Sequence, residues 1–452
     1  STKISNQANR INMTYNFNSE PNLTGKVVVQ THGCKLNQSD SETIARQFSE
    51  AGYEPIESVA DADVYVLNTC TVTANADAKA RQALRAARRI NPNAIIVATG
   101  CYPQRAAEDL QKLDCVSLVI NNTTKHDLVT KTIKLHQQSS DRQSRRPQAP
   151  SSLSVSSQSD TEISGIYRTR AMLKIQEGCN QICAYCIVPK VRGRERSISP
   201  EDLIRQIIDL QNHGYQEVVL TGTQLGSYGF DLARMNLTGL IKRILSETTI
   251  PRIRVSSLQP QEITPGLLSL WDDSRLCPHF HIPLQSGANQ ILQDMRRRYT
   301  TQQFAQSVDL IRSHLNEPSI TTDLIVGFPG EDEFFFNQTL GFIEHIQFSD
   351  MHVFPYSRRP GTSAYYYKDS IDSQTKKART NLVLNLAQQQ FNDFRQSQIS
   401  TIRPVLWESR GKGSSASVWS GLTNNYIRIY TENPSDLTNQ ITDTNLLGLG
   451  PK

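Results

Sequence analysis

Long apolar runs are absent from this sequence. No stretch reaches the roughly 18 consecutive apolar residues that a membrane-spanning helix needs. The N-terminus also lacks a basic segment followed by an apolar one, which is the pattern of a secretory signal. We therefore expect a cytoplasmic protein with no membrane partner.

A strong charge imbalance is absent as well. The chain has 48 Lys and Arg against 43 Asp and Glu, and a net charge of +5 is small for 452 residues, so composition alone does not indicate nucleic acid. The basic residues nevertheless gather in three places, at 79–89, 190–196 and 296–298. Each cluster is typical either of a solvated surface or of an RNA contact.

Apolar residues amount to only 37% of the chain, and two polar stretches explain much of this scarcity. One is the N-terminus, 1–24, and the other is a Ser/Gln-rich segment, 137–165. Neither can bury enough apolar surface to offset the entropy lost on ordering. We predict a flexible N-terminus and a flexible linker between two patterned regions.

The first patterned region, 25–136, alternates short apolar runs with helical patterns. The expected strands are 26–31, 64–68, 94–99 and 116–120. A helix is expected over 39–52, capped by Ser39 with Glu42 three residues later. This βαβ alternation predicts an α/β domain with a doubly wound parallel sheet.

The alternation restarts after the linker, in a domain predicted to span 166–400. The expected strands are 172–176, 217–222, 252–257, 279–284, 320–328 and 351–356. Six β/α repeats are too few for a closed eightfold barrel, so we expect an open or partial barrel with its site at the carboxyl ends of the strands. A helix over 375–398 and a small antiparallel β-barrel over 401–452 complete the prediction.

Three of the eight cysteines follow the first three expected strands. They are Cys34, Cys70 and Cys101, each flanked by small or polar loop residues. Because ligands of such sheets gather beyond the carboxyl ends of the strands, we expect these thiols to meet at one edge. The alternative is a structural role in the interior, which we expect for Cys115 and Cys277.

A second triplet, Cys179-x3-Cys183-x2-Cys186, directly follows the strand 172–176. No fourth Cys or His lies before His213, whereas structural zinc takes four protein ligands. A cubane cluster held by three cysteines leaves one iron for an external chelator, such as the methionine part of S-adenosylmethionine (SAM). The run therefore favours radical-SAM chemistry over zinc or a plain electron-transfer cluster.

Several segments together resemble the radical-SAM tRNA methylthiotransferases, from about residue 25 to about residue 450. They are THGCKLNQSDSE, NTCTVT, TGCYPQ, KIQEGCNQICAYCIVPKVRGRERS, LTGTQLGSYGFDL, HIPLQSGANQIL, DLIVGFPGE and HVFPYSRRPGTSA. The first, fifth and last resemble the branch that acts on N6-threonylcarbamoyladenosine. Gln224, Gln259 and Tyr365–Tyr367 depart from the usual pattern.

This resemblance implies two 4Fe–4S clusters, with Cys179, Cys183 and Cys186 holding the SAM-cleaving one. Cys34, Cys70 and Cys101 would hold an auxiliary cluster that carries the sulfur to be transferred. A radical derived from SAM would remove hydrogen from carbon 2 of the adenosine, and a second SAM would supply the methyl group. Two SAM molecules are thus expected per turnover.

SAM contacts are expected by position near the strand ends, although each residue could equally serve a turn. They are Tyr185, Thr221, Gly222, Thr223, Gln224, Ser256, Ser257, Gln285, Ser286, Gly327 and Phe328. Arg192, Arg194 and Arg196 are expected to contact RNA phosphates or the threonyl carboxylate. In the C-terminal unit, which resembles the small RNA-binding domain of this family, Tyr426 and Tyr430 could stack on bases or form the core, and Trp419 is expected in the core.

The predicted reaction is 2-methylthiolation of N6-threonylcarbamoyladenosine at tRNA position 37, beside the anticodon. Its expected partners are the anticodon loop of tRNA, an electron donor such as flavodoxin or ferredoxin, and a sulfur donor that the sequence does not identify. The alternatives are isopentenyladenosine in tRNA, an aspartate in a ribosomal protein, or a non-catalytic RNA-binding protein with a vestigial cluster.

Overall fold

The structure, a computed structural model, describes residues 24–144, 169–368, 371–410 and 418–450. The predicted flexible N-terminus and most of the predicted linker lie outside these ranges. Helix α4 (Leu128–Ser144) continues past 137, so the segment expected to begin the linker there is helical. None of the helices in the described ranges is long and apolar enough to cross a bilayer.

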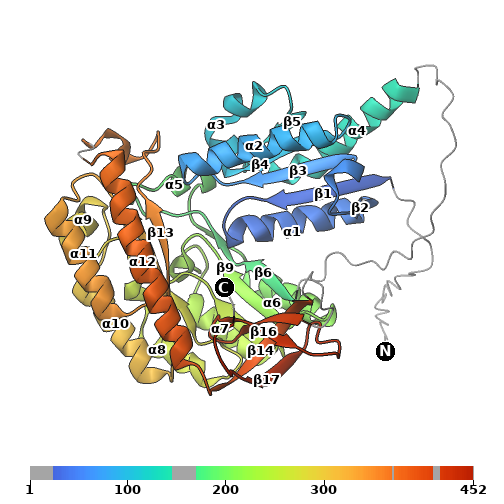
Figure 1. Ribbon diagram of the computed structural model, residues 1–452. Coiled ribbons are helices and arrows are strands. Elements are labelled where there is room, and N and C mark those ends of the chain that lie inside the picture. Colours follow the sequence, from blue (N-terminus) through green and yellow to red (C-terminus); the bar gives the residue numbers. More distant parts are fainter. Residues whose placement is uncertain (1–23, 145–168, 369–370, 411–417, 451–452) are drawn as a thin grey trace, which may run out of the picture.

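The N-terminal domain is a five-stranded parallel sheet with the order β2-β1-β3-β4-β5, which confirms the predicted doubly wound architecture (Figure 1). The strands are β1 (Gly25–Thr31), β2 (Tyr53–Pro55), β3 (Val64–Thr69), β4 (Ile95–Gly100) and β5 (Leu118–Ile120). The helices are α1 (Lys35–Glu50), α2 (Ala74–Ile90), α3 (Cys101–Gln111) and α4. Strands β3 and β4 are buried along their whole length, as expected for a sheet covered on both faces.

Helix α1 begins one turn earlier than the sequence predicts. Cys34 is its N-cap residue, and Ser39 lies buried inside the helix rather than capping it. Tertiary contacts explain the longer helix, because Leu36 is buried and the Asn37 amide donates to Asn68 Oδ1 at 3.0 Å. The start of α1 is therefore set by packing against β3 and not by a Ser cap.

The second domain is a curved array of six parallel strands. They are β6 (Arg170–Lys174), β9 (Glu217–Thr221), β10 (Arg252–Val255), β11 (His279–His281), β12 (Ser319–Val326) and β13 (Asp350–Pro355). Two three-stranded sheets, β10-β9-β6 and β11-β12-β13, are joined by parallel bridges between Ile253 and Leu276 and between Ser257 and His281. The six strands therefore run in chain order, which confirms the predicted partial barrel.

Helices cover the outer side of this array (Figure 1). They are α6 (Pro200–Asn212), α7 (Leu237–Glu247), α8 (Pro265–Leu268), α9 (Asn289–Asp294), α10 (Thr301–His314), α11 (Glu333–Ile346) and α12 (Ser373–Ser397). The short helix α5 (Val188–Arg192) instead lies against α3 of the N-terminal domain. Local signals set their starts: Ser199 caps α6, Asp332 caps α11, and Thr300 forms a capping box with Gln303 before α10. A short antiparallel pair, β7 (Gln176–Glu177) with β8 (Arg196–Ser197), frames the cysteine loop.

Alternate residues of the six strands point to opposite sides. Ile253, Phe280 and Leu324 belong to the large apolar core beneath the helices. Their neighbours on the strands point away from the helices, and we call this side the inner face. Its residues are Arg170, Met172, Lys174, Glu217, Val219, Thr221, Arg252, Arg254, His279, His281, Thr321, Asp323, His352 and Phe354. The inner face is thus mostly polar or charged.

The C-terminal unit is an antiparallel sheet of four strands in the order β16-β15-β14-β17. These are β14 (Ile402–Arg410), β15 (Val418–Thr423), β16 (Arg428–Glu432) and β17 (Ile441–Asn445). Trp419 is 3% exposed and packs with Val405 and Trp407, which confirms that it belongs to the core. The sheet lies against the amino ends of the barrel strands, because Arg252 and Arg254 donate to the carbonyl oxygens of Leu422 and Asn424, each at 3.0 Å.

Candidate active site

Three thiols stand at the carboxyl ends of adjacent strands of the N-terminal sheet. Cys34 follows β1, Cys70 follows β3 and Cys101 follows β4, and these strands are neighbours in the order β1-β3-β4. Burial is the main cause that raises the pKa of Cys70 to about 12, and the nearby thiols of Cys101 and Cys34 raise it further. The structure therefore brings the three residues together, as the strand order predicts.

Amide side chains border this triplet. The Asn37 amide also donates to the carbonyl oxygen of Thr69 at 3.2 Å, and its Oδ1 accepts from the Cys34 thiol at 3.3 Å. The amide of Asn122 lies 3.9 Å from Cys101 Sγ and donates to the carbonyl oxygen of Val191 at 2.8 Å. Hydrogen-bond donors beside cysteine sulfurs are one of the means by which proteins tune iron–sulfur clusters.

The second triplet lies on the loop between β7 and α5. Gly178 opens this loop with φ +82°, and a Cβ there would lie 2.0 Å from the carbonyl oxygen of Arg194. The loop is held by backbone bonds from Cys179 N to Gly193 O and from Cys186 N to Cys183 O, each at 3.1 Å. Burial raises the pKa of Cys186 to about 12.

The donor chemistry of both triplets fits cubane clusters. Each cysteine of such a cluster binds a different iron, so the three sulfurs need not converge on one point as the ligands of a single ion do. In the described ranges, the group of three potential ligand residues whose donor atoms lie within 4.8 Å of one another is His281, Asp323 and His352, and it contains no cysteine. Buried thiols with raised pKa values also need a metal centre to be held as thiolates. These features fit a cluster better than zinc.

The two triplets face each other across the contact between the domains. Cys101 packs against Ile187 and Val191, which belong to the start and body of helix α5 directly after the second triplet, and α3 lies against α5. Ser357 Oγ accepts from Ala74 N at 3.1 Å, so the loop after β13 meets the start of α2, a few residues beyond Cys70. Arg359 in the same loop donates to Asp77 Oδ2 at 2.6 Å and to Thr71 Oγ1 at 2.8 Å. Both cysteine loops and the end of β13 therefore surround one region.

The structure corrects the prediction for Arg192. Its side chain is 3% exposed and forms ion pairs with Asp40 and Glu177, both at 2.7 Å. A buried guanidinium with two carboxylate partners is not available to RNA, so Arg192 instead joins the domains. Arg194 and Arg196 are exposed on the same loop and remain candidates for RNA contact.

The residues expected to contact SAM lie at the carboxyl end of a barrel strand, as Thr221 does, beyond such an end, or, for Tyr185, within the second cysteine loop. Gln176 fastens the loop after β9 to the cysteine loop, because its Oε1 accepts from Thr223 N at 3.0 Å and its Nε2 donates to Gly178 O at 2.8 Å. Ser286 is fully buried and bonds Thr339 of α11 at 3.3 Å, so its side chain faces that helix. Phe328 is fully buried in a small apolar cluster that includes Ala184 and Tyr185 of the second cysteine loop.

Several polar residues at this edge were not assigned by sequence reasoning. Arg297, noted only within a basic cluster, donates to Cys183 Sγ at 3.1 Å and to Tyr299 Oη at 3.1 Å. Burial raises the pKa of Glu262 to about 7, and this carboxyl group accepts from the Gln224 amide at one of the positions that depart from the family pattern. Neither contact has a local sequence signal, since each joins loops far apart in the chain.

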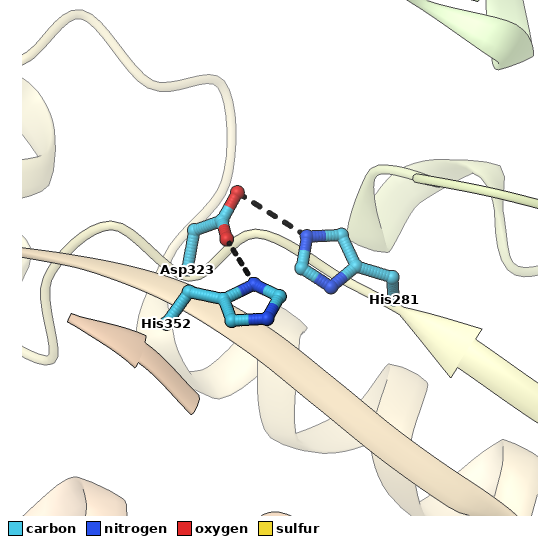
Figure 2. A group of neighbouring side chains, drawn as sticks. All are labelled: His281, Asp323 and His352. Atoms are coloured by element: carbon cyan, nitrogen blue, oxygen red, sulfur yellow. Dashed lines mark hydrogen bonds and ion pairs between the residues drawn. The ribbon is translucent and has the colours of Figure 1, made fainter. Parts of the chain in front are cut away.

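A polar cluster occupies the inner face on β11, β12 and β13 (Figure 2). Asp323 lies between two imidazoles, with its Oδ2 3.2 Å from His281 Nε2 and its Oδ1 3.2 Å from His352 Nδ1. Hydrogen bonds from both imidazoles keep the pKa of Asp323 well below its usual range, and Asp323 raises the pKa of His352. Strand alternation in HFHIPL, ITTDLIVGF and MHVFPY would have placed all three side chains on one face.

Known protein families match both halves of the chain. Residues 173–343 match the Radical SAM superfamily, and residues 26–121 match the Uncharacterized protein family UPF0004. The solved radical S-adenosylmethionine methyltransferase TsrM from Kitasatospora setae shares the fold, with a TM-score of 0.53 at 14% identity over 75% of this chain and 76% of that one. With its cysteine loop at the carboxyl ends of a partial barrel, the protein is a radical-SAM enzyme that uses SAM and a 4Fe–4S cluster.

Curated relatives define the family more narrowly. The threonylcarbamoyladenosine tRNA methylthiotransferase MtaB of Bacillus subtilis is 36% identical, with 94% of each chain covered, and that of Aquifex aeolicus is 38% identical, with 90% of this chain and 97% of the relative covered. The tRNA-2-methylthio-N(6)-dimethylallyladenosine synthase of Dictyoglomus thermophilum is 34% identical, with 91% and 93% covered. The chain therefore belongs to the radical-SAM tRNA methylthiotransferase family, in its MtaB-like branch, whose members carry two 4Fe–4S clusters.

Proposed function

We propose that the protein attaches a methylthio group to carbon 2 of N6-threonylcarbamoyladenosine at position 37 of tRNA. The observation that carries this proposal is the meeting of two cysteine triplets across the domain contact, with the inner face of the barrel beside them. The names of the MtaB relatives support the threonylcarbamoyl substrate. Relatives named for dimethylallyladenosine make that adenosine the second candidate.

In this proposal Cys179, Cys183 and Cys186 hold one cluster, and Cys34, Cys70 and Cys101 hold the other. When bound, the clusters and SAM would supply the radical, the sulfur and the methyl group that carbon 2 of an adenine needs, since this carbon is inert to acid–base catalysis. An external one-electron donor, such as flavodoxin or ferredoxin, would feed the first cluster.

The residues of the chain position these groups. Arg297 holds Cys183, Gln176 ties the loop after β9 to the cysteine loop, and Arg192 fixes α5 against α1. The target base must leave the stacked anticodon loop, which costs a few kcal/mol. Arg194 and Arg196 would offset part of that cost at the phosphates, and Tyr430, 64% exposed on the C-terminal sheet, is free to stack on a base.

The decisive experiment is anaerobic turnover with two tRNAs that differ only in the adenosine at position 37. The reconstituted enzyme should produce 2-methylthio-N6-threonylcarbamoyladenosine from the threonylcarbamoyl tRNA, measured by nucleoside mass spectrometry. It should leave the isopentenyl tRNA unchanged. Product from the isopentenyl tRNA alone would overturn the substrate assignment, and 5′-deoxyadenosine without product from either would overturn the reaction.

Charge reversal of Arg194 and Arg196 tests the RNA contact. The double Glu variant should bind tRNA more weakly, and the slope of log Kd against log salt should become shallower by about 2, because two phosphate contacts are lost. An unchanged slope would show that these guanidinium groups are only solvated.

A further inference from the structure

Lys35 is the residue that directly follows Cys34, and its side chain reaches the barrel. Helix α1, which begins at Lys35, lies between the N-terminal sheet and strand β6 (Figure 1). The Lys35 ammonium lies 5.6 Å from the ring centroid of Tyr426, which belongs to the C-terminal unit. One side chain thus connects the first cysteine triplet with the floor of the barrel.

A continuous line of contacts leads from this ammonium across the inner face. The ring of Tyr426 stacks on His279 with centroids 4.3 Å apart, and His279 Nε2 lies 3.2 Å from Thr321 Oγ1. Thr321 Oγ1 also lies 3.0 Å from His281 Nδ1, which brings the line to the His281–Asp323–His352 cluster. Asp323 raises the pKa of His352, and the nearby charge of Lys35 opposes this shift.

Lys35 differs from the neighbouring cations because it has no carboxylate partner. Arg252 and Arg254 share Glu217 at 2.9 Å, Arg170 pairs with Glu408, and Lys174 pairs with Asp40 at 2.8 Å. Within the described ranges, no carboxylate lies within ion-pair distance of Lys35. An ammonium placed in this way lacks an anion, and a ligand carboxylate would supply one.

The cluster of Figure 2 offers a second hydrogen-bond donor, His352, on the inner face that Lys35 reaches. Its donor atoms are already paired with one another and are not arranged to bind a metal ion. Both carboxylate oxygens of Asp323 face ring nitrogens, and the remaining nitrogen of His281 faces Thr321. The contacts of Asp323 orient His352 through Nδ1 and leave its Nε2 side for a ligand. The His352 side chain is 59% exposed although it belongs to the inner face, so the face is open at β13.

We propose that the Lys35 ammonium and the His352 imidazole bind the carboxylate of the threonylcarbamoyl group. This contact selects an adenosine with an anionic N6 substituent over one with an apolar substituent. The inference rests on the proposed function. It also ties selectivity to the sulfur-carrying site, because Lys35 and Cys34 are consecutive residues at the start of α1.

The test measures equilibrium binding of three anticodon stem-loops to the reconstituted enzyme. They carry threonylcarbamoyladenosine, its carboxyl methyl ester, or plain adenosine at position 37. The wild-type protein should bind the free acid about 10- to 100-fold more tightly than the ester, as expected for a charge-assisted hydrogen bond. Lys35→Gln should lose this preference while binding plain adenosine as before, and Lys35→Arg should restore part of it.

Lys131→Gln serves as the matched control, because Lys131 is a surface lysine that pairs with Asp127 far from the inner face. Iron and sulfide content, together with the electron paramagnetic resonance of the reduced protein, establish that each variant carries both clusters. His352→Gln is the second variant, and it leaves the Cys34 loop intact if Lys35→Gln lowers the iron content. It should reduce the acid-to-ester ratio in the same direction.

The inference is overturned if both variants keep the wild-type preference for the acid over the ester. It is also overturned if Lys35→Gln weakens all three stem-loops equally, since that result indicates a phosphate contact. The proposed function fails separately, when the wild-type enzyme turns over isopentenyladenosine and does not turn over the threonylcarbamoyl substrate. If the enzyme turns over the threonylcarbamoyl substrate and both variants keep the wild-type selectivity, the carboxylate-binding inference fails and the proposed function stands.

Discussion

Glu331 is a buried carboxylic acid, and the Arg379 guanidinium lies 3.7 Å from its Oε2. It is 1% exposed, its Oε2 accepts from Gly327 N at 2.6 Å, and its Oε1 is buried without a hydrogen-bond partner. Burial raises its pKa from 4.5 to about 7, so the folded protein keeps a proton there that the unfolded chain loses. The contribution of Glu331 to the free energy of unfolding is therefore fully present below about pH 4.5 and is lost as the pH rises through about 7.

Glu331→Gln should remove this dependence. We expect the wild-type free energy of unfolding to fall by on the order of 2 kcal/mol between pH 5 and pH 8 relative to the variant. Urea titrations of both proteins across that range measure the difference. Parallel stability curves would show that Glu331 is already ionised in the fold.

A glycine can be required by a positive φ alone or also by a close contact, and Gly193 and Gly178 exemplify the two cases. Its φ of +82° is similar to the +77° of Gly193, but a Cβ on Gly178 would meet the Arg194 carbonyl oxygen at 2.0 Å, whereas one on Gly193 would meet nothing within 4 Å. Gly178→Ala should therefore lower the iron content after reconstitution and destabilise the protein more than Gly193→Ala. The control should cost only the backbone strain, about 1 kcal/mol. Equal effects of the two substitutions would show that the close contact is relieved by a small shift.

The loop after β13 and helix α2 form the main polar contact between the domains beside the site. Arg359 is 4% exposed and bonds Asp77 and Thr71, while its neighbour Arg358 is exposed and donates to the Tyr365 carbonyl oxygen at 2.7 Å. Arg359→Ala should destabilise the protein by about 3–5 kcal/mol, because it removes a partner from a buried ion pair. Arg358→Ala should stay within about 0.5 kcal/mol.

A double-mutant cycle checks this coupling. The cycle combines Arg359→Ala with Asp77→Ala and measures unfolding of both single variants and the double variant in urea. We expect an interaction energy of about 1–3 kcal/mol, since the residues touch. Simple addition of the two single effects would show that Arg359 acts through another neighbour, and Arg105, which also pairs with Asp77 at 2.8 Å, would be the next candidate.

The sequence predicted these elements well where periodicity carries the information. Apart from the short edge strand β2, the strands of the N-terminal sheet and of the barrel follow from short apolar runs. The positions of Cys34, Cys70 and Cys101 follow from the ends of these runs, because parallel strands align their carboxyl ends. The start of α1 and the burial of Arg192 could not be read in the same way. Both depend on contacts over long sequence separations, such as Arg192 with Asp40, which are 152 positions apart.

Chemical roles showed the same division. The cysteine triplets were visible because their spacing is local or lies at strand ends. Lys35 belongs to the GCKLN segment, but the sequence does not indicate that it lies near Tyr426. That contact joins the first helix to the C-terminal sheet. For Tyr426 the sequence leaves base stacking and a core role open, and its ring stacks on His279 inside the protein.

At the scale of the whole molecule, buried ion pairs at the amino ends of the barrel strands join the barrel to the C-terminal sheet. Glu217 is fully buried between Arg252 and Arg254, whose guanidinium groups also bind carbonyl oxygens of the C-terminal sheet. Burial alone would raise the pKa of Glu217, but the two arginines bring it down to about 2. Its contribution to stability is therefore present above about pH 4.5 and is lost as the pH falls toward 2.

Glu217→Gln should cost about 3–5 kcal/mol at pH 7, because two buried guanidinium groups lose their anion. The variant should also lose less stability on acidification than the wild-type protein. The surface pair of Glu201 with Arg243 provides the control, and Glu201→Gln should change the free energy of unfolding much less than Glu217→Gln, because solvent screens this pair. Similar losses for both variants in urea titrations would contradict the role of Glu217 as the central anion of the barrel floor.

The ion pair between Arg359 and Asp77 spans 282 positions of the chain. At about 5–20 residues per second, a ribosome needs roughly 15–55 s to travel from one partner to the other. All three thiols of the N-terminal sheet are thus made well before the loop after β13, which meets the start of α2 beside them. Iron delivered to this triplet early in synthesis would therefore arrive before the second domain has formed, and the order of translation would set the order of cluster assembly.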